Sequence, residues 1–146
     1  VNVITKEYFQ SIVLEDKEFE LSGLREPLVQ TQSDIKTKPW GFYKSTFISQ
    51  YSQSKLLFVY PQQELSLQKH NFREEHWVVT KGECEVTIGN KVTAASAGMY
   101  FFIPKDVKHR IRNISSDNNL IVTEVQLGTY FGEDDIVRFD DIYGRS

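Results

Sequence analysis

The sequence is poor in the residues that cross-link a chain, anchor it in a membrane or charge it strongly. Its one cysteine, Cys84, excludes a disulfide within the chain and fits a reducing compartment. No apolar run approaches the roughly 20 residues of a membrane-spanning helix, and no basic and then apolar leader is present. A net charge of -3 provides no general attraction for nucleic acid or lipid. We therefore expect a cytoplasmic protein without nucleic-acid or membrane partners.

The chain is long enough for one domain with a core of its own. Because it begins with Val1 rather than Met, we expect a processed chain or a piece of a longer protein. Residues 3–14 predict an amphipathic helix, because their apolar side chains recur at helical spacing. These side chains are Ile4, Tyr8, Phe9, Ile12 and Val13. We assign residues 1–37 to a helix and an irregular arm, and residues 38–146 to a barrel with a C-terminal tail.

The second region consists of short β-rich runs separated by turn residues. Such runs include "FYKSTFI", "KLLFVY", "HWVVT", "ECEVTI", "HRIRN" and "LIVTEVQL". Many short strands at close spacing predict an all-β sandwich or barrel. Gly89-Asn90 predicts a two-residue hairpin. The acidic stretch "GEDD" predicts one helical turn near Glu133, because carboxylates favour a helix N-terminus.

The stretch "SLQKHNFREEHWVVTKG" contains two of the three histidines of the chain. Side chains at positions i and i+2 of a strand share a face, so Gln68 and His70 are expected to point the same way. The polar residues "NFRE" predict a bend, and a new strand is expected to begin near Glu75. His109, in "HRIRN", is the fourth expected ligand, whereas His76 alternates away from Glu75 and is interpreted as a surface or supporting residue.

These four side chains predict a metal site. One histidine on a strand is usually an ordinary side chain, but the combined spacing favours convergence. Gln68, His70, Glu75 and His109 offer nitrogen and oxygen ligands that suit Zn²⁺, and also Mn²⁺, Fe²⁺, Co²⁺ or Ni²⁺. We expect one divalent metal, with zinc as the first choice. The ion would keep net positive charge and act as a Lewis acid, because only Glu75 is charged.

The spacing of these residues resembles the two cupin motifs. The first corresponds to Gln62, Gln68, His70, Glu75 and Gly82, and the second to Gly98, Pro104, Asp106, His109 and Asn113. In this resemblance Gln62 and Asp106 stand where the motifs carry glycine. It implies a double-stranded β-helix, that is, a cupin or jelly-roll barrel, with the metal in its mouth.

A closer resemblance covers roughly residues 38–145. The segments "KPWGFYK", "FIPKDVKHRIRN" and "EVQLGTYFGEDDIVRFDDIYGR" are similar to the isomerase domain of type II mannose-6-phosphate isomerases. In that family the domain is often the C-terminal half of a bifunctional mannose-1-phosphate guanylyltransferase. The resemblance implies metal binding by the four residues above, and a catalytic or substrate-positioning role for Arg138 and Arg73. Where the family often has His-His-His-Arg, this chain has "HNFR", which alters the predicted rim of the pocket.

The implied reaction interconverts mannose 6-phosphate and fructose 6-phosphate through a cis-enediol, and it needs a base. Glu124 is the first candidate, because its apolar neighbours favour a raised pKa. Pairing of Glu124 with a buried arginine is an equal alternative, and His76 is the second candidate base. The phosphate needs a cation, and Arg138 is the preferred candidate. A structural ion pair of Arg138 with one of the "EDD" carboxylates is an equal alternative.

Further residues are expected around the substrate. Lys105 and Lys108 are candidate phosphate ligands, and Tyr130 is a candidate wall of the pocket. Alternation places Arg110 and Arg112 opposite His109, so they are assigned to the surface. Two other functions remain open: a cupin that epimerises or isomerises a nucleotide-linked sugar, and a non-catalytic sugar-binding cupin. A homodimer is a further expectation, because jelly-roll sheets offer broad faces.

Overall fold

The computed structural model describes residues 35–145. The predicted helix over 3–14, and the arm up to residue 34, lie outside the described residues. Within 35–145 the chain forms strands and no helix, which confirms the all-β prediction. In this part of the chain no helix has the length and apolar character needed to cross a membrane.

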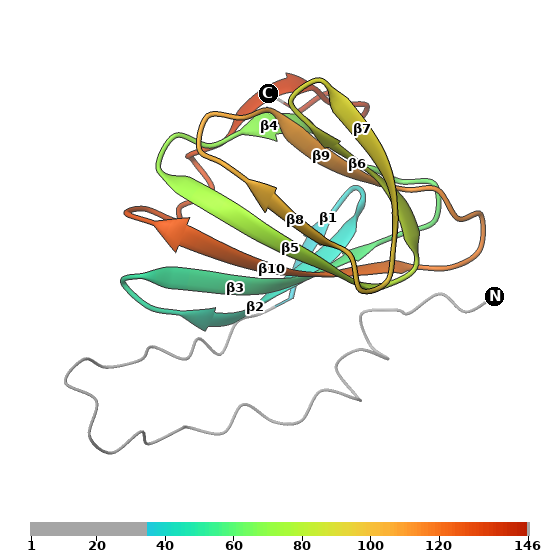
Figure 1. The fold of residues 1–146 in the computed structure, drawn as a ribbon, viewed down its shortest axis with the longest axis horizontal. Coiled ribbons are helices and arrows are strands. Elements are labelled where there is room, and N and C mark those ends of the chain that lie inside the picture. The colour runs from blue at the N-terminus through green and yellow to red at the C-terminus, as the bar shows by residue number, and fades with distance from the viewer. Residues whose placement is uncertain (1–34, 146) are drawn as a thin grey trace, which may run out of the picture.

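Two antiparallel sheets lie one above the other and enclose the interior (Figure 1). The larger sheet contains, in spatial order, β1 (Lys36–Lys38), β2 (Gly41–Ile48), β3 (Ser52–Val59), β10 (Leu120–Gly128), β5 (Arg73–Lys81) and β8 (Tyr100–Ile103). The smaller sheet contains β11 (Val137–Asp140), β4 (Leu67–Lys69), β9 (His109–Asn113), β6 (Glu83–Ile88) and β7 (Lys91–Ser96). Strands distant in sequence are therefore neighbours, as β10 is between β3 and β5. The strand β1 lies across the predicted boundary between arm and barrel.

Strict alternation decides which side chains face the interior. In β5 every second residue, from Arg73 to Val79, is buried, while the residues between them are half-buried or exposed. The same period of two runs through β10, whose buried side chains alternate from Leu120 to Gln126. The predicted common face of His109, Ile111 and Asn113 is confirmed, because all three are buried in β9.

The main apolar core fills one end of the space between the sheets. It includes Leu57, Val59, Trp77, Val79, Val86, Ile111, Leu120 and Val122. A smaller cluster lies on the other face of the larger sheet, where Phe42 and Phe58 stack with their ring centroids 4.7 Å apart. Alternation accounts for this second cluster, because Phe58 points away from its neighbours Leu57 and Val59.

The turns agree with the sequence prediction at three points. Gly89-Asn90 joins β6 to β7, with Gly89 at a φ of 61°, as the first central residue of a type II′ hairpin requires. Gln62 and Asp106, which stand where the cupin motifs carry glycine, both adopt a φ of 63°. Asp is one of the residues whose short side chain tolerates this left-handed conformation.

Two predicted boundaries were wrong. The strand β5 begins at Arg73 rather than near Glu75, because Arg73 already pairs with Gly128 of β10 and is buried with the rest of its face. The segment beginning at Glu133 is a turn rather than a helical turn; the N–H of Asp135 donates to the carbonyl oxygen of Gly132. It leads directly into β11, so no helix has room to propagate.

Candidate metal centre

Three of the four predicted ligands converge inside the barrel. His70, Glu75 and His109 offer ligand atoms that all lie within 4.8 Å of one another. His70 follows the end of β4, Glu75 is on the inner face of β5, and His109 begins β9. The two sheets thus both contribute. All three side chains are buried, at 1–2% exposure.

Backbone carbonyls fix the tautomer of both imidazoles. The Nδ1 atom of His70 lies 2.7 Å from the carbonyl oxygen of Asp135, and the Nδ1 atom of His109 lies 2.9 Å from that of Val107. A carbonyl oxygen only accepts, so each Nδ1 carries the proton and donates it. Each Nε2 therefore presents a lone pair to the interior, which is the arrangement found in metal-binding histidines.

The lone pairs of the two Nε2 atoms face the carboxylate of Glu75. The Nε2 atom of His70 lies 3.0 Å from one carboxylate oxygen, and the Nε2 atom of His109 lies 3.5 Å from the other. Within the described chain, the Nε2 atom of His109 has no hydrogen-bond partner. Atoms that carry lone pairs repel one another at such distances unless a proton or a cation is shared between them, so this donor set fits a divalent cation.

The charge states fit the same conclusion. Burial lowers the pKa of His109, which favours the neutral imidazole that a metal needs. Burial acts to raise the pKa of Glu75, but the positive charge around it, of which the Arg73 guanidinium is the permanent part, outweighs burial, so the pKa of Glu75 lies below its ordinary value. Glu75 is therefore an ionised carboxylate at neutral pH.

Gln68 lies beside this group. It is directly opposite His109 in the pairing of β4 with β9, so the two side chains share the inner face of the smaller sheet. Its Oε1 atom accepts a hydrogen bond from the hydroxyl of Ser66 at 3.3 Å. Gln68 also lines an open cleft beside the ligand group. Its role as the fourth ligand stays a prediction.

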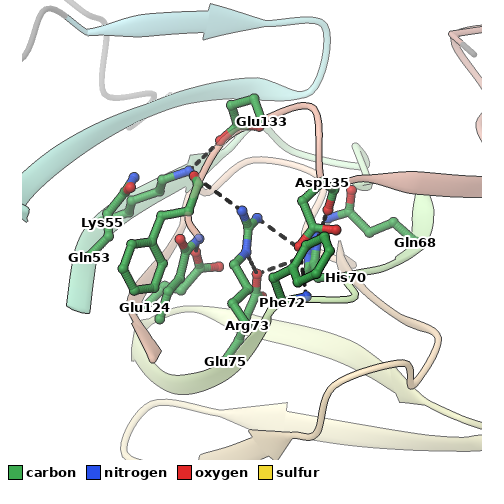
Figure 2. A network of polar contacts seen from close by, with 12 residues as sticks. Gln53, Lys55, Gln68, His70, Phe72, Arg73, Glu75, Glu124, Glu133 and Asp135 are labelled. Atoms are coloured by element: carbon green, nitrogen blue, oxygen red, sulfur yellow. Dashed lines mark hydrogen bonds and ion pairs between the residues drawn. The ribbon is translucent and has the colours of Figure 1, made fainter. Parts of the chain in front are cut away.

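Arg73 is buried against the same ligands. Its Nε atom donates to Glu75 at 3.2 Å, and a terminal nitrogen lies 3.4 Å from the Nε2 atom of His70. The other terminal nitrogen donates to the carbonyl oxygens of Phe131 and Gly132. Figure 2 shows the side chain between Glu124 and Lys55 on one side and His70 on the other. A bound cation and the Arg73 guanidinium would thus compete for two of the same lone pairs.

A second buried carboxylate, Glu124, lies next to the ligand group. The indole N–H of Trp77 is shared between Glu75, at 3.1 Å, and Glu124, at 2.9 Å. The amide of Gln126 donates to the other oxygen of Glu124. Burial first, and then the charge of Glu75, raise the pKa of Glu124 to about 7, although Lys55 acts in the opposite direction. Glu124 can therefore gain or lose a proton near neutral pH.

Gln68, Arg73, Glu75, Glu124 and Gln126 line an open cleft, whose space amounts to about 460 Å³ with the adjoining open solvent included; His70 and His109 are not among its lining residues. Its basic residues are Lys38, Lys55, Arg73, Arg138 and Arg145, and its acidic residues are Glu75, Glu124 and Glu133. The lining therefore has more positive than negative side chains, although the whole chain has a net charge of -3. Arg138 reaches it from β11, where it pairs with Gln68. This cleft suits an anionic ligand.

Three predicted substrate-binding residues are not among those that line this cleft. Lys105 and Lys108 are exposed, and the Nζ atom of Lys108 lies 4.0 Å from the ring centroid of Phe139. Tyr130 is exposed, and its hydroxyl donates to Asp134 at 2.5 Å. His76 points away from Glu75 and stacks against Tyr100.

Two residues at the site were missed by the sequence interpretation. Lys55 lies opposite Glu124 in the pairing of β3 with β10 and forms an ion pair with Glu133 at 2.5 Å. Asp135 accepts the hydrogen bond from His70 through its backbone. The sequence could have indicated Lys55, because a lysine on the inward face of an alternating strand is unusual. No local pattern identifies Asp135.

The chain matches the family model described as mannose-6-phosphate isomerase C-terminal over residues 27–141. It is 46% identical to the xanthan biosynthesis protein XanB of Xanthomonas campestris over 109 residues, which cover 75% of this chain and 23% of that protein. It is 42% identical to the alginate biosynthesis protein AlgA of Pseudomonas putida over 118 residues, 80% of this chain and 24% of that one. The matched region thus spans less than a quarter of these relatives.

Solved structures share the fold at low sequence identity. An RmlC-like cupin from Shewanella frigidimarina superposes with a TM-score of 0.60 at 17% identity, covering 70% of this chain and 88% of the other. Oxalate decarboxylase of Bacillus subtilis superposes with a TM-score of 0.65 at 16% identity, covering 80% of this chain and 33% of that one. These likenesses confirm the predicted cupin fold.

Proposed function

The chain belongs to the mannose-6-phosphate isomerase C-terminal family, and on that premise we propose that it interconverts mannose 6-phosphate and fructose 6-phosphate with a divalent metal. One observation carries the proposal: two imidazole lone pairs converge on an ionised carboxylate, and that carboxylate lines a cation-rich cleft together with a second carboxylate that can exchange a proton. The relatives take part in xanthan and alginate biosynthesis, so we extend the proposal to the supply of sugar units for a polysaccharide.

Gln68, His70, Glu75 and His109 would hold the ion, with zinc as the expected metal. The ion supplies a Lewis acid that stabilises negative charge on the sugar oxygens during enolisation. The protein itself holds the ligand side chains in position. The Nδ1 hydrogen bonds of the two histidines hold the rings in place before the ion arrives, which lowers the cost of ordering them.

Glu124 is the proposed base that moves the proton between C2 and C1. Its pKa of about 7 suits a group that must accept and return a proton at neutral pH. The hydrogen bonds from Trp77 and Gln126 fix its carboxylate at the wall of the cleft. The alternative from the sequence, a carboxylate paired with a buried arginine, is less favoured, because both carboxylate oxygens of Glu124 accept hydrogen bonds from these two neutral side chains.

The cations of the cleft would bind the phosphate and the developing oxyanion. Arg138 lines the cleft from β11, opposite Gln68 in the pairing of β11 with β4, and we propose that it holds the phosphate. Arg73 already donates to Glu75 and is proposed to stabilise negative charge on the sugar oxygens. Lys105, Lys108 and Tyr130 lie outside the lining and are at most contacts of the rim.

A coupled assay tests the proposal. Purified protein should convert mannose 6-phosphate to fructose 6-phosphate, lose this activity on treatment with a chelator, and regain it when Zn²⁺, Mn²⁺ or Co²⁺ is added. Metal analysis of the same samples should follow the activity. Full turnover in protein stripped of metal would refute the metal-dependent mechanism, whereas tight metal binding without turnover would favour the non-catalytic cupin or another sugar.

A further inference from the structure

Asp135 connects the loop before β11 to the bend that carries His70. Its carboxylate accepts hydrogen bonds from the backbone N–H groups of Asn71 and Phe72, both at 3.0 Å. Its backbone carbonyl oxygen accepts the Nδ1–H of His70 at 2.7 Å. The residue is 6% exposed, so water competes little for these bonds. Two different parts of one residue thus hold three successive residues of the bend.

The bend is fixed from its other side as well. The carbonyl oxygen of Phe72 accepts a hydrogen bond from the backbone N–H of Thr129 at 3.1 Å. Gly128 packs so closely here that a Cβ atom would lie 2.1 Å from the same oxygen. The bend is therefore held between the end of β10 and Asp135. Figure 2 shows Asp135 beside His70 and Phe72. A small displacement of Asp135 would turn the His70 ring rather than be absorbed by the bend.

We propose that Asp135 is a positioning residue that sets the tautomer and direction of His70, and through them the affinity of the site for its metal. The inference rests on the proposed metal site. The carboxylate anchors the loop to the bend, and the anchored loop aims its carbonyl oxygen at Nδ1. Because that oxygen can only accept, Nδ1 keeps its proton and Nε2 keeps the lone pair that faces Glu75.

The chemistry requires a carboxylate rather than an amide at this position. Two backbone N–H groups point at two separate oxygens, and both can be satisfied only by two acceptors. Asparagine of the same shape would satisfy one N–H and face the other with its own NH₂ group. The variant Asp135→Asn therefore loses one hydrogen bond and gains a repulsive contact, while the volume of the side chain is unchanged.

The neighbouring residue provides a matched control. Asp134 is exposed, and its carboxylate accepts a hydrogen bond from the hydroxyl of Tyr130 rather than from the backbone of the bend. We compare D135N with D134N in two measurements. Competition with a chromophoric chelator gives the affinity for Zn²⁺, and the visible spectrum of Co²⁺-loaded protein reports the geometry of coordination. D135N is expected to weaken metal binding by about tenfold, as loss of an outer hydrogen-bonding partner does, and to change the Co²⁺ spectrum. D134N should change neither.

The outcomes separate this inference from the proposed function. If the wild-type protein binds no metal, both the metal site and the role of Asp135 are refuted. If the wild type binds metal and D135N binds it equally tightly with the same Co²⁺ spectrum, the role of Asp135 alone is refuted. If D135N does not fold, a measurement on the unaltered protein still tests the inference. In ¹⁵N NMR of the imidazoles, His70 should be the Nδ1–H tautomer. An Nε2–H tautomer would overturn the inference.

Discussion

The two ends of the barrel interior use the same strands for opposite purposes. Along β10 the inward residues change from Leu120 and Val122 at one end to Glu124 and Gln126 at the other. The neighbouring strands change as well: β3 changes at the same level, and β5 changes one inward residue further along, because the apolar Trp77 lies opposite Glu124. In β3 the inward residues change from the polar Gln53 and Lys55 to the apolar Leu57 and Val59. In β5 they change from the polar Arg73 and Glu75 to the apolar Trp77 and Val79.

The apolar end of the interior stabilises the fold, and the polar end carries the residues proposed for its chemistry. The apolar end buries large side chains, which is the main favourable contribution to folding. The polar end buries charges, and each of these costs free energy unless it is paired. Hydrogen bonds and ion pairs offset the cost without turning it into a clear gain. Buried groups of this kind are therefore candidates for binding or catalysis, and damage to each end should have a different effect.

Replacement of a ligand should have the largest effect. His109→Ala removes a proposed neutral ligand from the centre, so metal content and isomerase activity should both be lost. The affinity for metal should fall by more than the roughly 100-fold that loss of an outer hydrogen-bonding partner can cause. The thermal unfolding transition should persist, because the apolar end is untouched. His76→Ala is the control, since His76 lies on the outer face of β5. Retention of metal by His109→Ala would show that it is not a ligand.

Replacement of the proposed base should leave the metal in place. Glu124→Gln should lower kcat by about 10²- to 10⁴-fold, the usual contribution of a general base, at unchanged metal content. In the wild type the activity should rise with pH as Glu124 loses its proton, around or below pH 7, because its pKa is raised to about 7 and a bound cation would lower it. Glu74→Gln, on the outer face of β5, should retain activity. A variant at Glu124 with wild-type kcat would assign the base elsewhere.

The smallest effect is expected at the apolar end, and there it should concern stability alone. Val79 is fully buried, whereas its neighbour Val78 is 42% exposed. Val79→Ala should lower the free energy of unfolding by about 2 kcal/mol, from lost burial and the cavity that remains. Val78→Ala should change it much less, and both should bind metal as the wild type does. Denaturant unfolding with metal titration measures the two quantities; weaker metal binding in Val79→Ala would show that the two ends are coupled.

Much of this division was readable from the sequence, because it depends on local alternation. The period of two in β5 predicts that Glu75 and Trp77 face inward and His76 outward, and the structure confirms it. The convergence of His70, Glu75 and His109 followed from spacing and from the resemblance to cupins. The predicted metal role of these residues is a proposal that the experiments above address.

What the sequence concealed depends on contacts between distant segments. The carbonyl oxygen of Asp135 reaches His70 across 65 positions, and a backbone acceptor carries no mark in the sequence. Lys55 meets Glu124 only because β3 and β10 are neighbours in the sheet. Lys105 and Lys108, the candidate phosphate ligands, lie in an exposed turn and its flank, outside the lining of the cleft, and their role stays a prediction.

The central claim is that the polar end of the barrel holds one cation between its two sheets. The most direct test is an anomalous-scattering map from crystals grown with Zn²⁺. The account predicts a single strong peak inside the barrel, about 2.1 Å from the Nε2 atoms of His70 and His109 and next to the carboxylate of Glu75. A map without a peak there, in which the Arg73 guanidinium keeps its bonds to Glu75 at saturating metal, would contradict it.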